Sequence, residues 1–165
     1  MAFSVCFVCT GNICRSPMAE SVFRARLDEA GLGDLVQVGS AGTDGWHEGD
    51  GADPRTVSAL TAAGYESDHV ARRFQVSWFP RLDLVIALDA GHQRTLRRLA
   101  PTPADADKVR LLRSYDPEAA ARGDLDVPDP YYGEEDGFDA CLRMVEAASD
   151  GLLDAVREAR EGRAA

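Results

Sequence analysis

The sequence is poor in cysteine, in positive charge and in long hydrophobic runs. Its four cysteines are too few for a disulfide scaffold and are typical of a protein in a reducing compartment. No apolar run reaches the length of a membrane span, and the first residues lack the positive charge that opens a secretory signal peptide. We therefore expect a cytoplasmic protein with no membrane partner, although secretion without a signal peptide is compatible with these features.

Acidic residues outnumber basic ones by 28 to 18, so the formal net charge is −10. Nucleic acids and anionic membranes attract proteins through positive charge, which argues against either as a main partner of this chain. The hydrophobic fraction of 45% is ordinary for a globular protein. Because 165 residues can bury the core of one domain, we expect a single domain over residues 1–165, and a monomer.

Apolar runs alternate with helical patterns along the whole chain, which predicts an α/β domain with a parallel sheet. We expect strands at 4–8, 35–38, 82–88 and 109–112, helices at 17–30, 53–64, 91–100 and 138–160, and loops at 40–43, 44–51 and 114–137. The last loop is long enough to suggest a functional role. A sheet of four parallel strands with helices on both faces forms a crevice at the carboxyl ends of its strands.

The segment from Cys9 to Arg15 carries the clearest chemistry, a thiol and a guanidinium separated by five residues. It follows the apolar run 5–8 and precedes Ser16 and Pro17, which are typical of a helix start. A loop between a strand and a helix N-terminus directs backbone N–H groups into a concavity that favours anions. A thiol there ionises more easily, and an arginine fork matches two phosphate oxygens. The sequence therefore predicts a nucleophile and a phosphate-binding loop in one segment.

Other residues of this segment have more than one interpretation. The hydroxyl of Ser16 could donate to a thiolate at Cys9, or cap the helix that follows, and the two roles are compatible. The short amide of Asn12 suits a residue that holds the loop by side-chain hydrogen bonds. Cys6, Cys9 and Cys14 have a spacing that could bind a metal, but a strand holds Cys6 rigidly and no fourth ligand lies nearby in sequence. We expect no metal.

Two motifs resemble those of the low-molecular-weight protein tyrosine phosphatases, bacterial members included. Residues 8–20, Val-Cys-Thr-Gly-Asn-Ile-Cys-Arg-Ser-Pro-Met-Ala-Glu, look like the signature of that family, and residues 129–132, Asp-Pro-Tyr-Tyr, look like its second motif. Weaker likenesses at 40–43 and 87–89 extend the similarity over nearly the whole chain. The resemblance implies a flavodoxin-like fold of the phosphotyrosine phosphatase I type, with four parallel strands and helices on both faces.

The resemblance also implies a reaction. Cys9 would attack the phosphorus of a phosphotyrosine and form a phosphocysteine, and Asp129 would act as general acid and then as general base. The phosphate-binding residues that it implies are Thr10, Gly11, Asn12, Ile13, Cys14 and Arg15. The implied substrates are tyrosine-phosphorylated proteins and small aryl phosphates, and phosphate or other oxyanions would bind in the loop. The resemblance implies no cofactor, because the loop supplies the positive charge.

The choice of Asp129 as the acid depends on its motif, since the sequence has many acidic residues. Asp126 and Asp116 lie in the same predicted loop and are its rivals. The Pro-Tyr-Tyr that follows Asp129 selects it over both.

The resemblance extends to residues around the loop. Tyr131 and Tyr132 would form an aromatic wall of the substrate cleft, and could themselves be phosphorylated or simply pack their loop. Trp46, in a polar loop where an indole is hard to bury, is expected to form the opposite wall, with a place in the peripheral core as the alternative. Ser40 and His69 match positions that brace the phosphate loop, although for His69 a structural role with satisfied hydrogen bonds is equally compatible.

The remaining cysteines and one histidine complete the expectations. By resemblance, Cys14 would form a reversible disulfide with an oxidised Cys9 and protect it from further oxidation. Cys6 and Cys141 are expected to be buried and inert. His92 stands where the family pattern predicts an asparagine, which leaves the role of that helix start undefined.

Two other functions compete with phosphatase activity. A thioredoxin-coupled arsenate reductase uses a similar loop on the same fold but needs two relay cysteines near the middle of the chain, and none lies between Cys14 and Cys141. A silent phosphotyrosine-binding module would not need the nucleophile, the arginine and the acid together. The sequence therefore predicts a protein tyrosine phosphatase.

Overall fold

Buried apolar residues build the central sheet of the computed structural model, which describes residues 2–164. Within these residues the sheet has four parallel strands in the order β2-β1-β3-β4. The strands are β1 (Phe3–Cys9), β2 (Val36–Gly42), β3 (Leu84–Ala87) and β4 (Val109–Leu111). Strand β1 is central and its last residue, Cys9, is paired with Gly42. The prediction of an α/β fold with a four-stranded parallel sheet is confirmed.

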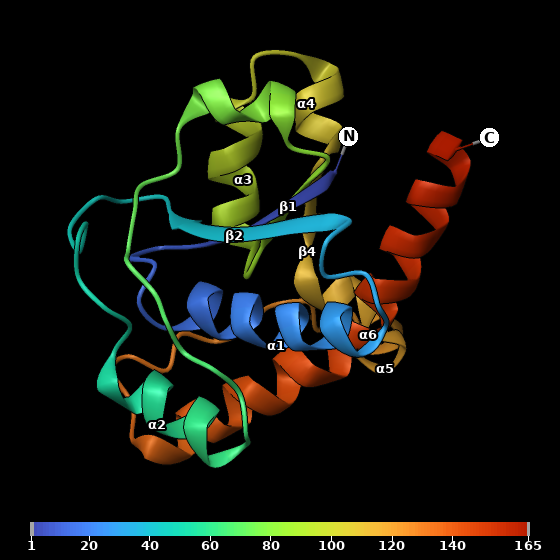
Figure 1. Ribbon diagram of the computed structural model, residues 1–165. Helices are drawn as coiled ribbons and strands as arrows, with labels where there is room; N and C mark the ends of the chain where they lie inside the picture. The colour runs from blue at the N-terminus through green and yellow to red at the C-terminus, as the bar shows by residue number, and fades with distance from the viewer. Residues whose placement is uncertain (1, 165) are drawn as a thin grey trace.

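Helices cover both faces of the sheet (Figure 1). One face carries α1 (Arg15–Glu29), α2 (Pro54–Ala62), α5 (Pro117–Arg122) and α6 (Glu135–Ala164), and the other carries α3 (Ala90–Leu99) and α4 (Pro103–Asp107). Among the described residues, the 3₁₀ helix η1 (Val76–Arg81) precedes β3, and the 3₁₀ helix η2 (Leu112–Tyr115) lies between β4 and α5. None of the helices in the described residues combines the length and the hydropathy of a membrane span.

Each face of the sheet buries its own apolar core. On the α1 side, Phe7 and Phe23 meet edge to face with ring centroids 5.7 Å apart. On the α3 side, Phe74 and Phe79 pack in the same way at 5.2 Å. Aromatic pairs of this geometry add to the burial of apolar surface; the first joins β1 to α1, and the second lies within the segment that precedes β3.

Two boundaries near the phosphate loop differ from the prediction. Helix α1 begins at Arg15 rather than at residue 17, and Cys14 occupies its N-cap position without a side-chain cap. Pro17 is tolerated there because N–H groups in the first turn of a helix have no partner within it. Residues 40–42 were expected in a loop but belong to β2, because they pair with residues 7–9 of β1.

The expected loop over residues 114–137 is only partly a loop. It contains the end of η2 and all of α5, whose N-terminus is capped by Asp116 and whose C-terminus ends at Gly123 with φ of +70°. Helix α6 begins at residue 135 instead of 138, and α4 and η1 were not predicted. The missed helices are short, and short helices have weak periodicity. Their caps were readable, since Thr102 and Asp116 each precede a proline.

Candidate active site

The nucleophile candidate, Cys9, ends the central strand and faces the first turn of α1. Its Sγ lies 2.9 Å from the hydroxyl oxygen of Ser16. That oxygen also accepts a hydrogen bond from Nδ2 of Asn12 at 2.8 Å, and its own hydrogen has two acceptors in reach, the sulfur at 2.9 Å and the carbonyl oxygen of Ala41 at 3.4 Å. The interpretation of Ser16 as the helix N-cap is wrong, because Cys14 holds that position. The geometry instead fits the alternative, a donor to the Cys9 thiolate.

Asn12 is the residue that holds the loop in shape. It is fully buried and has φ of +59°, a left-handed conformation that asparagine tolerates better than most residues. Its Nδ2 also donates to the hydroxyl of Ser40 at 2.9 Å, and its Oδ1 accepts from the backbone of Arg72 at 2.9 Å. His69 lies with Nε2 2.6 Å from the carbonyl oxygen of Asn12. The structure thus brings Ser40 and His69 together on Asn12.

Arg15 projects from the first residue of α1 into the same site, with its side chain only 4% exposed. Its Nη1 donates to Oδ2 of Asp89 at 2.8 Å and to the carbonyl of Val127 at 2.9 Å. Burial raises the pKa of Asp89, but hydrogen bonds from the His92 backbone and Arg15 outweigh it and hold that pKa below its ordinary value. A charged carboxylate therefore fixes the direction of the guanidinium.

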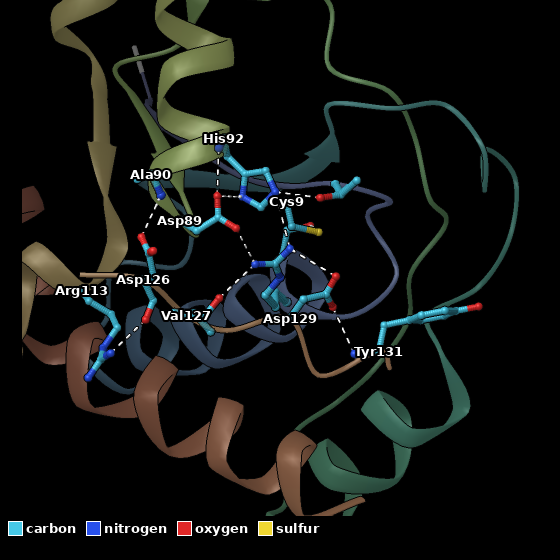
Figure 2. Close-up of polar contacts among 12 residues, drawn as sticks. Cys9, Asp89, Ala90, His92, Arg113, Asp126, Val127, Asp129 and Tyr131 are labelled. Carbon is cyan, nitrogen blue, oxygen red and sulfur yellow. Dashed lines mark hydrogen bonds and ion pairs between the residues drawn. The ribbon is translucent and has the colours of Figure 1, made fainter. Parts of the chain in front are cut away.

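Asp129 faces this guanidinium from the segment before α6. Its Oδ2 lies 3.6 Å from Nη2 of Arg15, and its Oδ1 accepts from the backbone N–H of Tyr131 at 3.1 Å. With 39% of its side chain exposed, Asp129 is within reach of both solvent and the loop. In Figure 2, Cys9, Asp89 and Asp129 lie close together, and dashed lines join the two aspartates to the guanidinium.

The carboxylates of the two rival acids, Asp126 and Asp116, accept hydrogen bonds from backbone N–H groups at the starts of helices. Asp126 accepts from the backbone of Ala90 at the start of α3, 2.8 Å away, and Asp116 caps α5 (Figure 2 shows Asp126 directed at Ala90). Both carboxylates are therefore committed to helix N-termini. Asp129, in contrast, faces Arg15.

The segment that carries Asp129 is tied to the sheet by two long-range contacts. The N–H of Val127 donates to the carbonyl of Leu88, just beyond β3, at 2.8 Å. Buried Arg113 donates to the carbonyl of Asp126 at 2.9 Å (Figure 2). These bonds place the segment beside Arg15.

A cavity of about 300 Å³ opens over the loop. Its walls comprise Cys9, Thr10, Gly11, Ile13, Cys14, Arg15, Asp44, Trp46, His47, Asp129, Tyr131 and Tyr132. Trp46 and Tyr132 are 87% and 90% exposed, and Tyr131 is 37% exposed, so all three aromatic side chains stand at its mouth. Asn12 is buried behind the wall, where it contacts the loop rather than the cavity.

Sequence reasoning missed several residues of the site. His47 packs on Gly11 so closely that a Cβ there would lie 3.0 Å from its ring, and Asp44 also lines the cavity. Asp89 was not predicted as a site residue and belonged only to the weaker family likeness at residues 87–89. An aspartate that follows a buried strand and precedes a helix is nevertheless typical of a helix N-cap. Val127 contributes only its backbone carbonyl, for which no side-chain signal exists.

The other cysteines differ from Cys9 in environment. Burial raises the pKa of Cys14, Cys6 and Cys141 to about 12 in each case, so all three stay neutral thiols. Cys6 lies in the core on the α3 side of the sheet, whereas Cys9 and Cys14 belong to the core on the α1 side. The three cysteines therefore do not converge on a metal, and the described residues contain no cluster of potential metal ligands.

The sequence matches the family model described as low molecular weight phosphotyrosine protein phosphatase over residues 4–162. It is 74% identical to a low molecular weight protein-tyrosine-phosphatase of Streptomyces coelicolor over the full length of both chains. It is 48% identical over 160 residues to low molecular weight protein-tyrosine phosphatase A of Mycobacterium tuberculosis, covering 96% of this chain and 95% of the relative.

The fold has a similar counterpart among solved structures. A crystal structure of a protein tyrosine phosphatase from Entamoeba histolytica superposes with a TM-score of 0.90 at 31% identity, covering 96% of this chain and 99% of that one. The family match spans the sheet, the loop from Cys9 to Arg15 and Asp129 alike.

Proposed function

This chain belongs to the low-molecular-weight phosphotyrosine protein phosphatase family and is a protein tyrosine phosphatase, and from this premise we propose that Cys9, Arg15 and Asp129 carry its reaction. One observation supports these roles above the others. The three side chains line a single cavity, with Ser16 beside the sulfur and Asp89 behind the guanidinium. A nucleophile, an oxyanion-binding cation and a partly exposed acid are the groups that metal-free phosphoryl transfer requires.

In the first step the Cys9 thiolate attacks phosphorus. The S–P bond forms while the bond to the aryl oxygen breaks, and the proton of Asp129 passes to the leaving phenolate. The loop N–H groups and Arg15 stabilise the charge on the three equatorial oxygens. Because Nη1 of Arg15 is bound to Asp89 and Val127, Nη2 and Nε are the nitrogens left to meet phosphate.

In the second step water frees the phosphate. The Asp129 carboxylate takes a proton from a water molecule that attacks phosphorus, the S–P bond breaks, and inorganic phosphate leaves. The electron pair returns to sulfur, where the Ser16 hydroxyl at 2.9 Å stabilises the thiolate. Phosphate and other oxyanions are expected to compete for the empty loop.

The cavity walls support an aryl phosphate as substrate. Trp46, Tyr131 and Tyr132 provide aromatic surface at the mouth, and Cys9, which is only 3% exposed, lines the same cavity, so an aryl group at the mouth would direct its phosphate inwards. Arsenate reduction is not supported, because Cys6 and Cys141 are buried neutral thiols unsuited to a relay.

Hydrolysis of p-nitrophenyl phosphate in the presence of EDTA tests the proposal. We expect Cys9→Ser to abolish turnover, and Asp129→Asn to lower kcat by about 10²–10³-fold. Asp126→Asn is the matched control, since it removes an acid three residues away that caps α3, and its kcat should stay within about threefold of the wild type. Unchanged turnover in Cys9→Ser, or equal losses in the two aspartate variants, would overturn these assignments.

A further inference from the structure

His92 lies in the first turn of α3 with 6% of its surface exposed, directly behind the phosphate loop. Its Nε2 is 2.8 Å from the hydroxyl of Thr10 and 3.5 Å from Nη2 of Arg15, and its Nδ1 is 3.2 Å from Oδ1 of Asp89 (Figure 2). We propose that His92 is a positioning residue that orients Thr10 and Arg15 for phosphate binding. The inference rests on the proposed function, since it concerns the same loop.

The neighbours of the ring decide which nitrogen carries the proton. A guanidinium only donates, so the nitrogen that faces Arg15, Nε2, must present its lone pair. The Asp89 carboxylate, 3.2 Å from Nδ1, only accepts, so its charge favours the hydrogen on Nδ1, although the two groups are not aligned as a hydrogen bond. The Thr10 hydroxyl therefore donates to Nε2. The opposite tautomer would place one N–H against Arg15 and a lone pair against the carboxylate, both unfavourable.

The same surroundings keep the ring neutral. Burial and then the Arg15 guanidinium lower the pKa of His92 to about 4, and the carboxylates of Asp89, Asp129 and Asp126 oppose this shift without reversing it. At neutral pH the lone pair of Nε2 is therefore available as an acceptor. A protonated ring would lose this lone pair and would repel the arginine.

Thr10 is consequently held from two sides. Its carbonyl accepts from the backbone of Asp44 at 3.0 Å, and the carbonyl of Cys9 accepts from that of Thr43 at 2.9 Å. The side-chain bond to His92 adds a second tie on the opposite flank of the loop. Because Thr10 directly follows the nucleophile, these ties orient the first peptide groups of the phosphate cradle.

Nε2 of His92 also lies close to the guanidinium of Arg15. Nη2 of Arg15, one of the nitrogens left to meet phosphate, stands between Nε2 of His92 at 3.5 Å and Oδ2 of Asp129 at 3.6 Å. A neutral acceptor on one side and an acid on the other keep this nitrogen in the cavity. Its partner Nη1 is already fixed by Asp89.

A pair of amide variants separates this role from simple packing. In His92→Gln the amide oxygen can reach the position of Nε2, whereas in His92→Asn the side chain ends near the position of Nδ1 and cannot contact Thr10. We expect kcat/KM for p-nitrophenyl phosphate to fall about tenfold in His92→Asn, the worth of one buried hydrogen bond, and to stay within about threefold of the wild type in His92→Gln. The inhibition constant of orthovanadate should rise in parallel with the loss.

A double-variant cycle with Thr10→Val completes the test. If the bond to Thr10 carries the effect, His92→Asn adds little to the loss already caused by Thr10→Val. The inference would be overturned if the losses in kcat/KM of the two single variants multiplied in the double variant, or if His92→Asn had wild-type kinetics. Cys9→Ser in the same assay keeps the two proposals apart. Turnover in that variant would refute the proposed function. An inactive Cys9→Ser together with wild-type kinetics in His92→Asn would refute only the role of His92.

Discussion

The Sγ of Cys9 lies 2.9 Å from the hydroxyl oxygen of Ser16, which receives its own hydrogen bond from Asn12. The hydroxyl hydrogen has the sulfur at 2.9 Å and the carbonyl oxygen of Ala41 at 3.4 Å as acceptors, and the sulfur lies nearer. A thiolate gains from such a donor more than a neutral thiol does, since hydrogen bonds to charged groups are stronger.

Ser16→Ala should therefore slow alkylation of Cys9 by iodoacetamide at neutral pH by about tenfold, since the variant lacks the hydroxyl that lies beside the sulfur and can donate to a thiolate. Ser149→Ala is a matched control, because Ser149 is also a buried helical serine, bonded only to Val145. Its alkylation rate should equal that of the wild type. The alkylation rates can be followed by mass spectrometry of the peptide that contains Cys9. An alkylation rate in Ser16→Ala equal to that of the control would contradict this account.

Trp46→Ala should weaken substrate binding with little effect on stability. The indole is 87% exposed, so its loss removes few folded-state contacts and should change the free energy of unfolding by less than about 0.5 kcal/mol. We expect KM for a phosphotyrosine peptide to rise about fivefold with kcat nearly unchanged, from the loss of one aromatic contact. Leu35→Ala is the control, since Leu35 is 45% exposed and does not line the cavity. An equal KM in both variants would exclude Trp46 from the substrate cleft.

Mild peroxide should inactivate the enzyme reversibly through a disulfide between Cys9 and Cys14. The Cys9 thiolate reacts with peroxide to a sulfenic acid, and the Cys14 thiol then condenses with it and releases water. In the structure both cysteines are free, and Cys14 is a buried neutral thiol, so it should not itself be the first site of oxidation. Thiol treatment should restore activity in the wild type and in Cys141→Ala but not in Cys14→Ser. Peptide mapping without the Cys9–Cys14 link would disprove the mechanism.

Stability should depend on pH through His92. In the unfolded chain the imidazole titrates near 6.5, whereas in the folded protein burial and Arg15 lower its pKa to about 4. Between these values the unfolded state binds a proton that the folded state does not, so the free energy of unfolding falls as the pH falls from 6.5 towards 4, by up to about 3 kcal/mol. Urea titrations should show a shallower pH dependence over this window in His92→Gln. Parallel curves for the two proteins would contradict the assigned shift.

Local sequence patterns predicted the elements that depend on interactions between residues close in sequence, and did not predict those that depend on contacts with distant segments. The strand before Cys9 and the helix after it were predicted within two residues, because each combines a long pattern with a strong start signal. Residues 40–42 were predicted as part of a loop that follows the apolar run 35–38, yet pairing with β1 makes them a strand. That pairing comes from a distant segment, and no local propensity reports it.

The sequence by itself determined the phosphate loop, since a thiol, an asparagine able to turn the chain and an arginine at a helix start act through neighbours a few residues away. Only the tertiary structure decided what surrounds Arg15. Asp89 and the carbonyl of Val127 lie 74 and 112 residues further along the chain, and His92 reaches Thr10 across 82 residues. Parallel strands end at one edge of a sheet and carry these groups to the same place. A buried charge must find partners wherever the fold supplies them.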